Sequence, residues 1–202
     1  MLGDQLKEQG FCVLKDCFDS QLALDTINDI ESWFSKSENV FSNLPEGRRF
    51  AIPNGLNIPF FEKSKFALNI PKVTNLLKEI TNDNLKYCHH FDIHKNLSSD
   101  WHEDTQFKHI GRYSNQAAWD GNIYSEDAQN NLKIYRVAFY LEDHSDDPYG
   151  LSVKPRSHLS KGEDQELTIH TEIGDVIIFD PRIQHRGVDY EQSKLKACGK
   201  NR

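Results

Sequence analysis

The first part of the chain carries hydrophobic residues at helical spacing. Residues 3–9 predict a short helix that ends at Gly10, a residue typical of helix C-termini. Residues 21–34 repeat apolar positions on one helical face, and Ser20 is a suitable N-cap for this second helix. Pro71 suits the first turn of a third helix that runs to about residue 82. The inward positions of this third helix are expected to be Val73, Leu76, Leu77 and Ile80.

Short runs of β-branched and aromatic residues dominate the chain from residue 85 onward. Turn-forming residues separate these runs, which is typical of strands. The expected strands are 85–93, 133–141, 151–153, 167–170 and 175–180, in addition to FCVL (11–14) near the N-terminus, while 35–70 is expected to form loops over the core. Helices followed by many short strands predict a mainly β fold, a double-stranded β-helix (jelly roll, cupin-like) with flanking N-terminal α-helices.

Composition and charge narrow the class of protein. The chain has 202 residues, 37% of them hydrophobic, and no repeat or linker divides it, so residues 1–202 are expected to form one domain. The net charge is −7 without a basic stripe, which argues against nucleic acid as a partner. The apolar runs are far shorter than the roughly 20 residues that cross a bilayer, and the N-terminus resembles no secretory signal. We therefore expect a cytoplasmic protein with free thiols, with Cys12 and Cys88 on strands and partly buried.

The segment SDWHEDTQ (99–106) carries the first candidate chemistry. His102 and Asp104 are two positions apart, so that in extended backbone their side chains point the same way and can converge on one ion. A second histidine, His185, follows a strongly apolar strand. Two histidines and one carboxylate form the facial triad of non-haem Fe(II) oxygenases. Such a site leaves open positions for an anionic chelating co-substrate and for O₂.

Four blocks of sequence, in the same order, resemble the phytanoyl-CoA dioxygenase family of Fe(II)/2-oxoglutarate-dependent oxygenases. The resemblance covers the chain from near residue 5 to its end. The blocks are EQGFCVLKDCF (8–18), WHEDTQ (101–106), RVAFYLEDHSDDPYGLSVKPRSH (136–158) and IGDVIIFDPRIQHRG (173–187). The resemblance implies that His102, Asp104 and His185 are iron ligands, catalytic in this sense, with Fe(II), 2-oxoglutarate and O₂ as cofactor and co-substrates.

The resemblance also implies the outcome of the reaction. Family members that halogenate have a small residue in place of the carboxylate, so Asp104 favours hydroxylation of a small-molecule substrate with release of succinate and CO₂. The loops over 35–70 and 107–131 are expected to shape the substrate pocket. The sequence does not name the substrate or the oligomeric state.

The far carboxylate of 2-oxoglutarate is held in the family by an arginine on the strand after the distal histidine. An arginine suits this role because its planar fork grips a carboxylate at two points. Arg202 is the preferred candidate because it follows a turn at Gly199, Lys196 lies closer to the usual offset, and Arg136 is a third choice. Tyr87 is a further candidate for a hydrogen bond to the co-substrate.

The sequence departs from the family pattern in two places. Arg156 stands where the family has a glycine, which is expected to change only a turn. The family continues with at least one more strand after the distal histidine, so the domain is expected to be truncated at its C-terminus. Two other classes therefore stay open: a catalytically impaired jelly-roll binding module, and a metal-dependent cupin that does not use 2-oxoglutarate.

Overall fold

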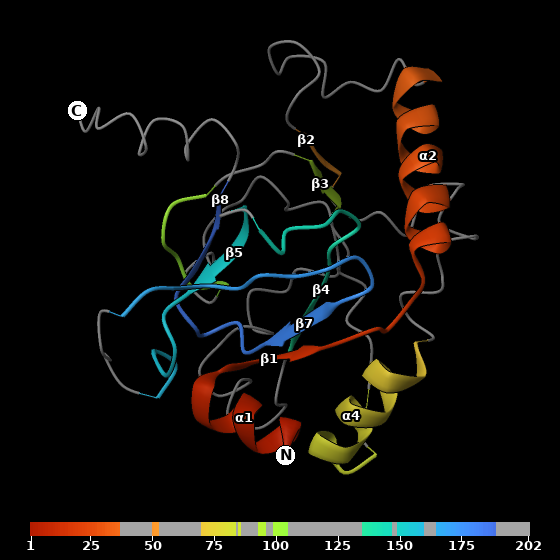
Figure 1. The fold of residues 1–202 in the computed structure, drawn as a ribbon. Helices are drawn as coiled ribbons and strands as arrows, with labels where there is room; N and C mark the ends of the chain where they lie inside the picture. The colour runs from red at the N-terminus through yellow and green to blue at the C-terminus, as the bar shows by residue number, and fades with distance from the viewer. Residues whose placement is uncertain are drawn as a thin grey trace, which may run out of the picture.

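The structure is a computed structural model that describes residues 1–36, 50–52, 70–83, 85, 93–95, 99–104, 135–146, 149–159 and 165–188. Figure 1 shows short strands at the centre with helices around them. The elements are α1 (Leu2–Gln9), β1 (Phe11–Leu14), α2 (Ser20–Lys36), β2 (Phe50–Ile52), α4 (Pro71–Thr81), β3 (Ile93–Lys95), β4 (Arg136–Phe139), β5 (Gly150–Val153), β6 (Leu167–Thr168), β7 (Val176–Phe179) and β8 (His185–Val188). No helix in these described segments could span a lipid bilayer.

The three predicted helices are present. α1 ends at Gly10, whose φ of 84° is left-handed, and a Cβ there would lie 2.6 Å from the Nδ1 of His158. α4 has Pro71 in its first turn and buries the four predicted inward residues. The cap of α2 differs from the prediction. The backbone N–H of Leu22 donates to Oδ1 of Asp19 at 2.7 Å, so Asp19 caps this helix and the assignment to Ser20 is wrong.

The first sheet has the order β1-β7-β4, and all its strands pair antiparallel. Its two faces bury different partners because side chains alternate along each strand. Cys12, Leu14, Val176 and Ile178 pack against the apolar residues of α1 and α4, which lie together beneath the sheet in Figure 1. Phe11, Ile177 and Phe179 face the other way and pack against Leu151 and Val153 of β5.

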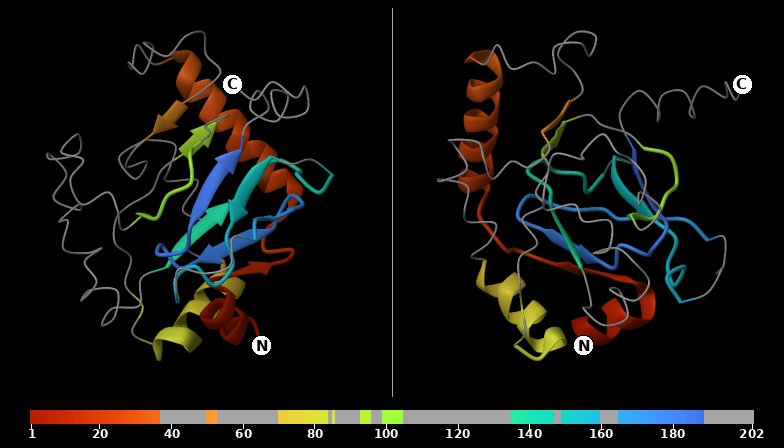
Figure 2. Two further views of the ribbon diagram at one scale, coloured as in Figure 1. Left: turned by 90° about the vertical axis from the view of Figure 1, so that its left-hand side faces the viewer. Right: turned by 180° about the vertical axis from the view of Figure 1, so that it is seen from behind.

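The second sheet has the order β6-β5-β8 and is also antiparallel. Figure 2 shows β5 and β8 side by side, next to the first sheet. Two sheets with a shared apolar interior and helices on one outer face agree with the predicted mainly β architecture at this level. β2 and β3 form a separate antiparallel pair. β2 falls in the range expected to form loops, and neither β2 nor β8 was predicted from the pattern.

Most of the predicted strands match in position. The ranges 133–141, 167–170 and 175–180 contain the shorter strands β4, β6 and β7, and the range 151–153 lies within β5, which begins one residue earlier. Residues 86–92 of the predicted strand 85–93 lie outside the described residues. Cys12 is on β1 as expected but is fully buried, while Cys88 lies outside the described residues.

Arg156 has an unusual backbone conformation. It lies in the turn after β5 with a φ of 66°, in the left-handed region that glycine adopts without strain. Its backbone N–H donates to the carbonyl of Gln9 at 2.9 Å, which joins this turn to the end of α1. This turn therefore holds a non-glycine residue in a conformation that favours glycine.

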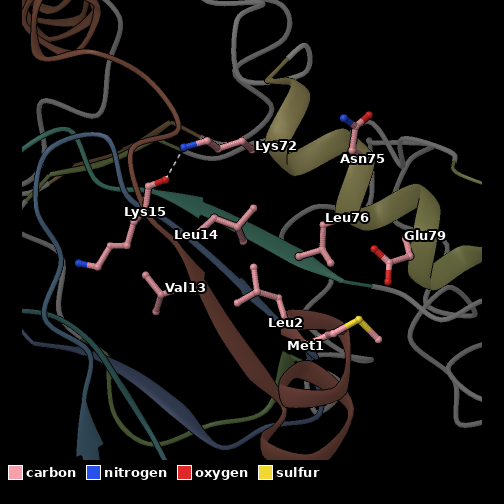
Figure 3. Close-up of a pocket in the computed structure, with 10 residues that line it drawn as sticks. Met1, Leu2, Val13, Leu14, Lys15, Lys72, Asn75, Leu76 and Glu79 are labelled. Atoms are coloured by element: carbon pink, nitrogen blue, oxygen red, sulfur yellow. Dashed lines mark hydrogen bonds between the residues drawn. The ribbon is translucent and has the colours of Figure 1, made fainter.

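A hollow of about 720 Å³ lies between α1, β1 and α4. Figure 3 shows Leu2, Leu14 and Leu76 around it and the ammonium of Lys72 donating to the backbone carbonyl of Lys15, a contact of 3.0 Å. None of the three candidate metal ligands lines this hollow. It is therefore separate from the site described below.

Candidate metal centre

Backbone hydrogen bonds attach the segment 99–104 to β8 and to the turn before it. His102 and His185 exchange two N–H···O=C bonds, of 3.0 and 2.9 Å. The N–H of Ser99 donates to the carbonyl of Gly187 at 3.1 Å, and the N–H of Asp104 donates to that of Pro181 at 2.9 Å. The paired residues are 77 to 88 positions apart in the sequence and are thereby held next to each other.

The three predicted ligands converge at this junction. Their candidate ligand atoms all lie within 4.8 Å of one another. Oδ1 of Asp104 lies 3.9 Å from Nε2 of His102 and 3.8 Å from Nε2 of His185. The two imidazole rings are tilted with their centroids 4.3 Å apart. The structure thus brings together side chains that the sequence places far apart.

Backbone carbonyls fix the orientation of both imidazoles. Nδ1 of His102 lies 2.7 Å from the carbonyl oxygen of Asp100, and Nδ1 of His185 lies 2.9 Å from that of Ile183. A carbonyl oxygen can only accept, so each Nδ1 carries the proton and donates it. The lone pair of each ring is then on Nε2, the atom that faces Asp104, and this is the usual support of a metal-binding histidine.

The carboxylate of Asp104 has its two oxygens in different roles. Oδ2 accepts a hydrogen bond of 2.7 Å from Nε of Arg136, the first residue of β4. Oδ1 faces the imidazoles. The side chains of Asp104 and Arg136 are 11% and 24% exposed, so this charged contact is largely removed from water and correspondingly strong.

Burial sets the charge of the distal histidine. The side chain of His185 is 6% exposed, and its ring lies 4.9 Å, centroid to centroid, from that of Phe179. This burial lowers the pKa of His185, with the carboxylate of Asp104 acting in the opposite direction. The neutral imidazole that results is the form that binds a metal.

These residues fit a divalent transition metal. Two ligand atoms that are each about 2.1 Å from one ion lie about 3.0 Å apart at a right angle and about 4.2 Å apart when opposite. The carboxylate-to-imidazole separations of 3.9 and 3.8 Å are about 1 Å longer than the right-angle spacing that a facial triad uses, a difference that small side-chain rotations can close. The donor set of two imidazoles and one carboxylate suits Fe(II) with open coordination positions.

The back face of the same junction carries an aromatic stack. Trp101 and Arg186 flank the His102–His185 bridge, and the guanidinium of Arg186 lies 4.7 Å from the centre of the indole ring. The ammonium of Lys154 lies 5.2 Å from that centre. Arg186 also donates to Glu166 at 3.1 Å. The alternation of side chains therefore directs the histidines to the site and their neighbours to this stack.

The remaining predicted site residues divide into two groups. Arg136 is brought to the site, in contact with Asp104. Tyr87, Lys196 and Arg202 lie outside the described residues, so their roles stay predictions. Sequence reasoning missed the backbone acceptors at Asp100 and Ile183 and the contact between Arg136 and Asp104. No motif marks a backbone acceptor, but a basic residue within the predicted apolar strand 133–141 was a usable signal for Arg136.

Comparison with solved structures finds the same fold in several enzymes. The non-heme alpha ketoglutarate dependent epimerase SnoN, from nogalamycin biosynthesis, is 13% identical over 94% of this chain and 75% of SnoN, with a TM-score of 0.64. HygX from Streptomyces hygroscopicus, with nickel and 2-oxoglutarate bound, is 16% identical over 92% of this chain and 80% of HygX, with a TM-score of 0.58. EctD from S. alaskensis, with 2-oxoglutarate and 5-hydroxyectoine, is 13% identical over 93% of this chain and 69% of EctD, with a TM-score of 0.63.

At these low identities the likeness concerns the fold. No protein-family model matches the sequence, and no curated protein does. The fold is one that non-haem, 2-oxoglutarate-dependent enzymes share, and the residues at the junction described above form a donor set that could hold a metal ion.

Proposed function

We propose that this chain is a non-haem Fe(II)/2-oxoglutarate-dependent dioxygenase that hydroxylates a small molecule. In this proposal it belongs to the phytanoyl-CoA dioxygenase family, and its two sheets are part of a double-stranded β-helix. The observation that carries the proposal is the convergence of His102, Asp104 and His185, whose candidate ligand atoms all lie within 4.8 Å of one another. The fold shared with enzymes whose structures hold 2-oxoglutarate supports it.

The protein side of the reaction follows from the described contacts. His102, Asp104 and His185 would hold the metal, and the carbonyls of Asp100 and Ile183 keep both imidazoles in the binding tautomer. Iron supplies, when bound, the oxidative decarboxylation of 2-oxoglutarate by O₂ to succinate and CO₂ and the transfer of the second oxygen atom to a substrate C–H bond. Phe179 and the buried position of His185 exclude water from one side of the site.

The co-substrate needs a cation for its far carboxylate. We propose Arg202 for this role, with Lys196 as the alternative, and Tyr87 as a hydrogen-bond donor to the same molecule. An arginine would bind the carboxylate through two parallel hydrogen bonds, and a lysine would act as a point charge. Exchange of Arg202 for methionine should therefore weaken 2-oxoglutarate binding while metal binding is kept.

Hydroxylation is the outcome we favour among those known for this fold. SnoN is an epimerase and SnoK, also from nogalamycin biosynthesis, is a carbocyclase, so the fold alone does not choose the outcome. Asp104 occupies the position that a halide would need, which argues against halogenation. Which of the remaining outcomes occurs depends on the substrate, and identification of the reaction product would distinguish them.

Turnover of 2-oxoglutarate without substrate tests the class of enzyme. The purified chain, supplied with Fe(II), 2-oxoglutarate and O₂, should release succinate slowly. When the chain is mixed with Fe(II) and 2-oxoglutarate without O₂, a visible charge-transfer band should appear. His102→Ala and Asp104→Ala should abolish both signals. Asp146→Ala is the control, because it removes an exposed carboxylate that lies outside the site.

The two other classes give different results in the same experiment. A cupin that does not use 2-oxoglutarate would bind the metal but form neither the band nor succinate. A binding module without catalytic function would bind no metal at this site. Succinate formation that persists in His102→Ala would remove these residues from the mechanism.

A further inference from the structure

We propose that Arg136 is a positioning residue that keeps Asp104 a one-oxygen ligand, so that the metal retains the positions that the co-substrate needs. This inference rests on the proposed function, because it assigns a role in the same site. It differs from the sequence-based suggestion that Arg136 binds the far carboxylate of 2-oxoglutarate.

The register of β4 directs Arg136 to the site. Arg136 lies opposite Phe179 on β7, and Phe179 contacts the ring of His185. Val137 packs against the helix-side cluster, whereas Ala138 packs against the cluster between the sheets. Because side chains alternate along a strand, Arg136 shares the inner side with Ala138. The guanidinium thus approaches Asp104 from a rigid strand.

The contact with Arg136 gives the two carboxylate oxygens of Asp104 different partners. Nε of Arg136 donates to Oδ2 of Asp104 at 2.7 Å, while Oδ1 lies 3.8 Å from Nε2 of His185. Nε is the donor nearest the stem of the arginine, so the bond leaves little freedom for the carboxylate to rotate. Oδ2 is thus engaged in a charge-assisted bond, while Oδ1 is the oxygen whose contacts with both imidazoles are within 4 Å.

The number of open positions follows from this arrangement. A six-coordinate metal with three protein ligand atoms retains three positions, and a chelating co-substrate occupies two of them. If Asp104 bound through both oxygens, the chelate would fill the shell and no position would remain. Arg136 therefore acts on reactivity as well as on affinity, since it holds Oδ2 away from the metal.

Co(II) titration of Arg136 variants tests the proposal. Co(II) is a spectroscopic probe whose visible bands report the number and geometry of its ligands. We expect Arg136→Met to change these bands before any 2-oxoglutarate is added and to bind Co(II) about 10- to 100-fold more weakly, the usual effect of removing a group that orients a metal ligand. Arg136→Lys should restore part of the affinity, because it keeps the charge without the fixed direction of Nε.

Controls separate this role from the alternatives. Arg156→Met removes an exposed arginine from a turn and should leave the Co(II) bands unchanged. If Arg136 instead binds 2-oxoglutarate, Arg136→Met will bind Co(II) within twofold of wild type and only the titration with 2-oxoglutarate will weaken, which overturns the proposal. Circular dichroism and a thermal melt identify a variant that fails to fold, in which case Arg136→Lys and Arg136→Gln carry the comparison.

The result also distinguishes this proposal from the proposed function. A wild-type chain that binds no Co(II) would overturn both. A wild-type chain that binds Co(II) and 2-oxoglutarate, with the same bands in all Arg136 variants, would overturn the positioning role and leave the proposed function standing.

Discussion

Two backbone carbonyls determine which nitrogen each triad histidine presents. The acceptors at Asp100 and Ile183 lie two residues before His102 and His185 respectively, so each ligand is oriented by its own segment. This local device needs no particular side chain at the acceptor position, which is why the sequence shows no sign of it. Local surroundings also determine the reactivity of Cys12 and the backbone strain at Arg156.

Cys12 should resist alkylation in the folded protein. It is fully buried on β1, and this burial raises the pKa of its thiol to about 12. At pH 8 roughly one thiol in ten thousand would be ionised, and the thiolate is the reactive form. Iodoacetamide labelling followed by peptide mass spectrometry should modify Cys17, which is partly exposed, well before Cys12. Labelling of both at equal rates without denaturant would contradict the burial.

Arg156→Gly should stabilise the protein. The φ of 66° at Arg156 costs a non-glycine residue about 1–2 kcal/mol, of which the greater chain entropy of unfolded glycine cancels a part. We expect the free energy of unfolding to rise by about 0.5–1 kcal/mol, measured by urea denaturation. Arg156→Ala is the matched control and should have little effect, because alanine keeps the strain. A destabilised glycine variant would mean that the arginine side chain has a role of its own.

At the scale of elements, the junction between segment 99–104 and β8 organises the site. The histidines face inward from it, and Trp101 and Arg186 stack on its back face. The sequence indicated the alternation that separates these two faces, and it placed most strands correctly from their apolar runs. It did not indicate β8, whose residues HRGV include only one apolar side chain, because this strand is defined by its pairing with β5.

Trp101→Leu should loosen this junction. The cations of Arg186 and Lys154 lie over the indole ring, at 4.7 and 5.2 Å from its centre. Cation–π contacts contribute about 0.5–2 kcal/mol, so we expect a loss of about 1–2 kcal/mol in urea denaturation. Trp101→Phe keeps an aromatic face and should lose less. Equal stability of the leucine variant and the wild type would show that the stack does not hold the segment in place.

At the scale of the whole molecule, distant segments form one site on a common scaffold. Composition and periodicity predicted a mainly β fold with N-terminal helices, because an element that buries one face has apolar residues at regular spacing in its sequence. The convergence of His102 and Asp104 with His185 came from the triad chemistry and the family resemblance, since pairing over 81 positions depends on how the sheets assemble. The bond between Arg136 and Asp104 depends on the same assembly and was not predicted.

Metal binding should stabilise the entire chain. A ligand that binds only the folded state at about 100 times its Kd adds about 2.7 kcal/mol, which for a chain of this length raises Tm by about 5–10 °C. Scanning calorimetry with Ni(II) should show this shift in the wild type. Mg(II) should have little effect, because it prefers oxygen ligands over imidazole. A shift of the same size in Asp104→Ala would place the metal elsewhere.

Iron content after anaerobic equilibrium dialysis against Fe(II), compared between the wild type and His185→Ala, shows whether the three residues hold a metal ion. We expect about one iron per wild-type chain and a large loss in the variant, with both chains folded by circular dichroism. A wild-type chain that retains no iron, or a variant that retains as much as the wild type, would contradict this expectation.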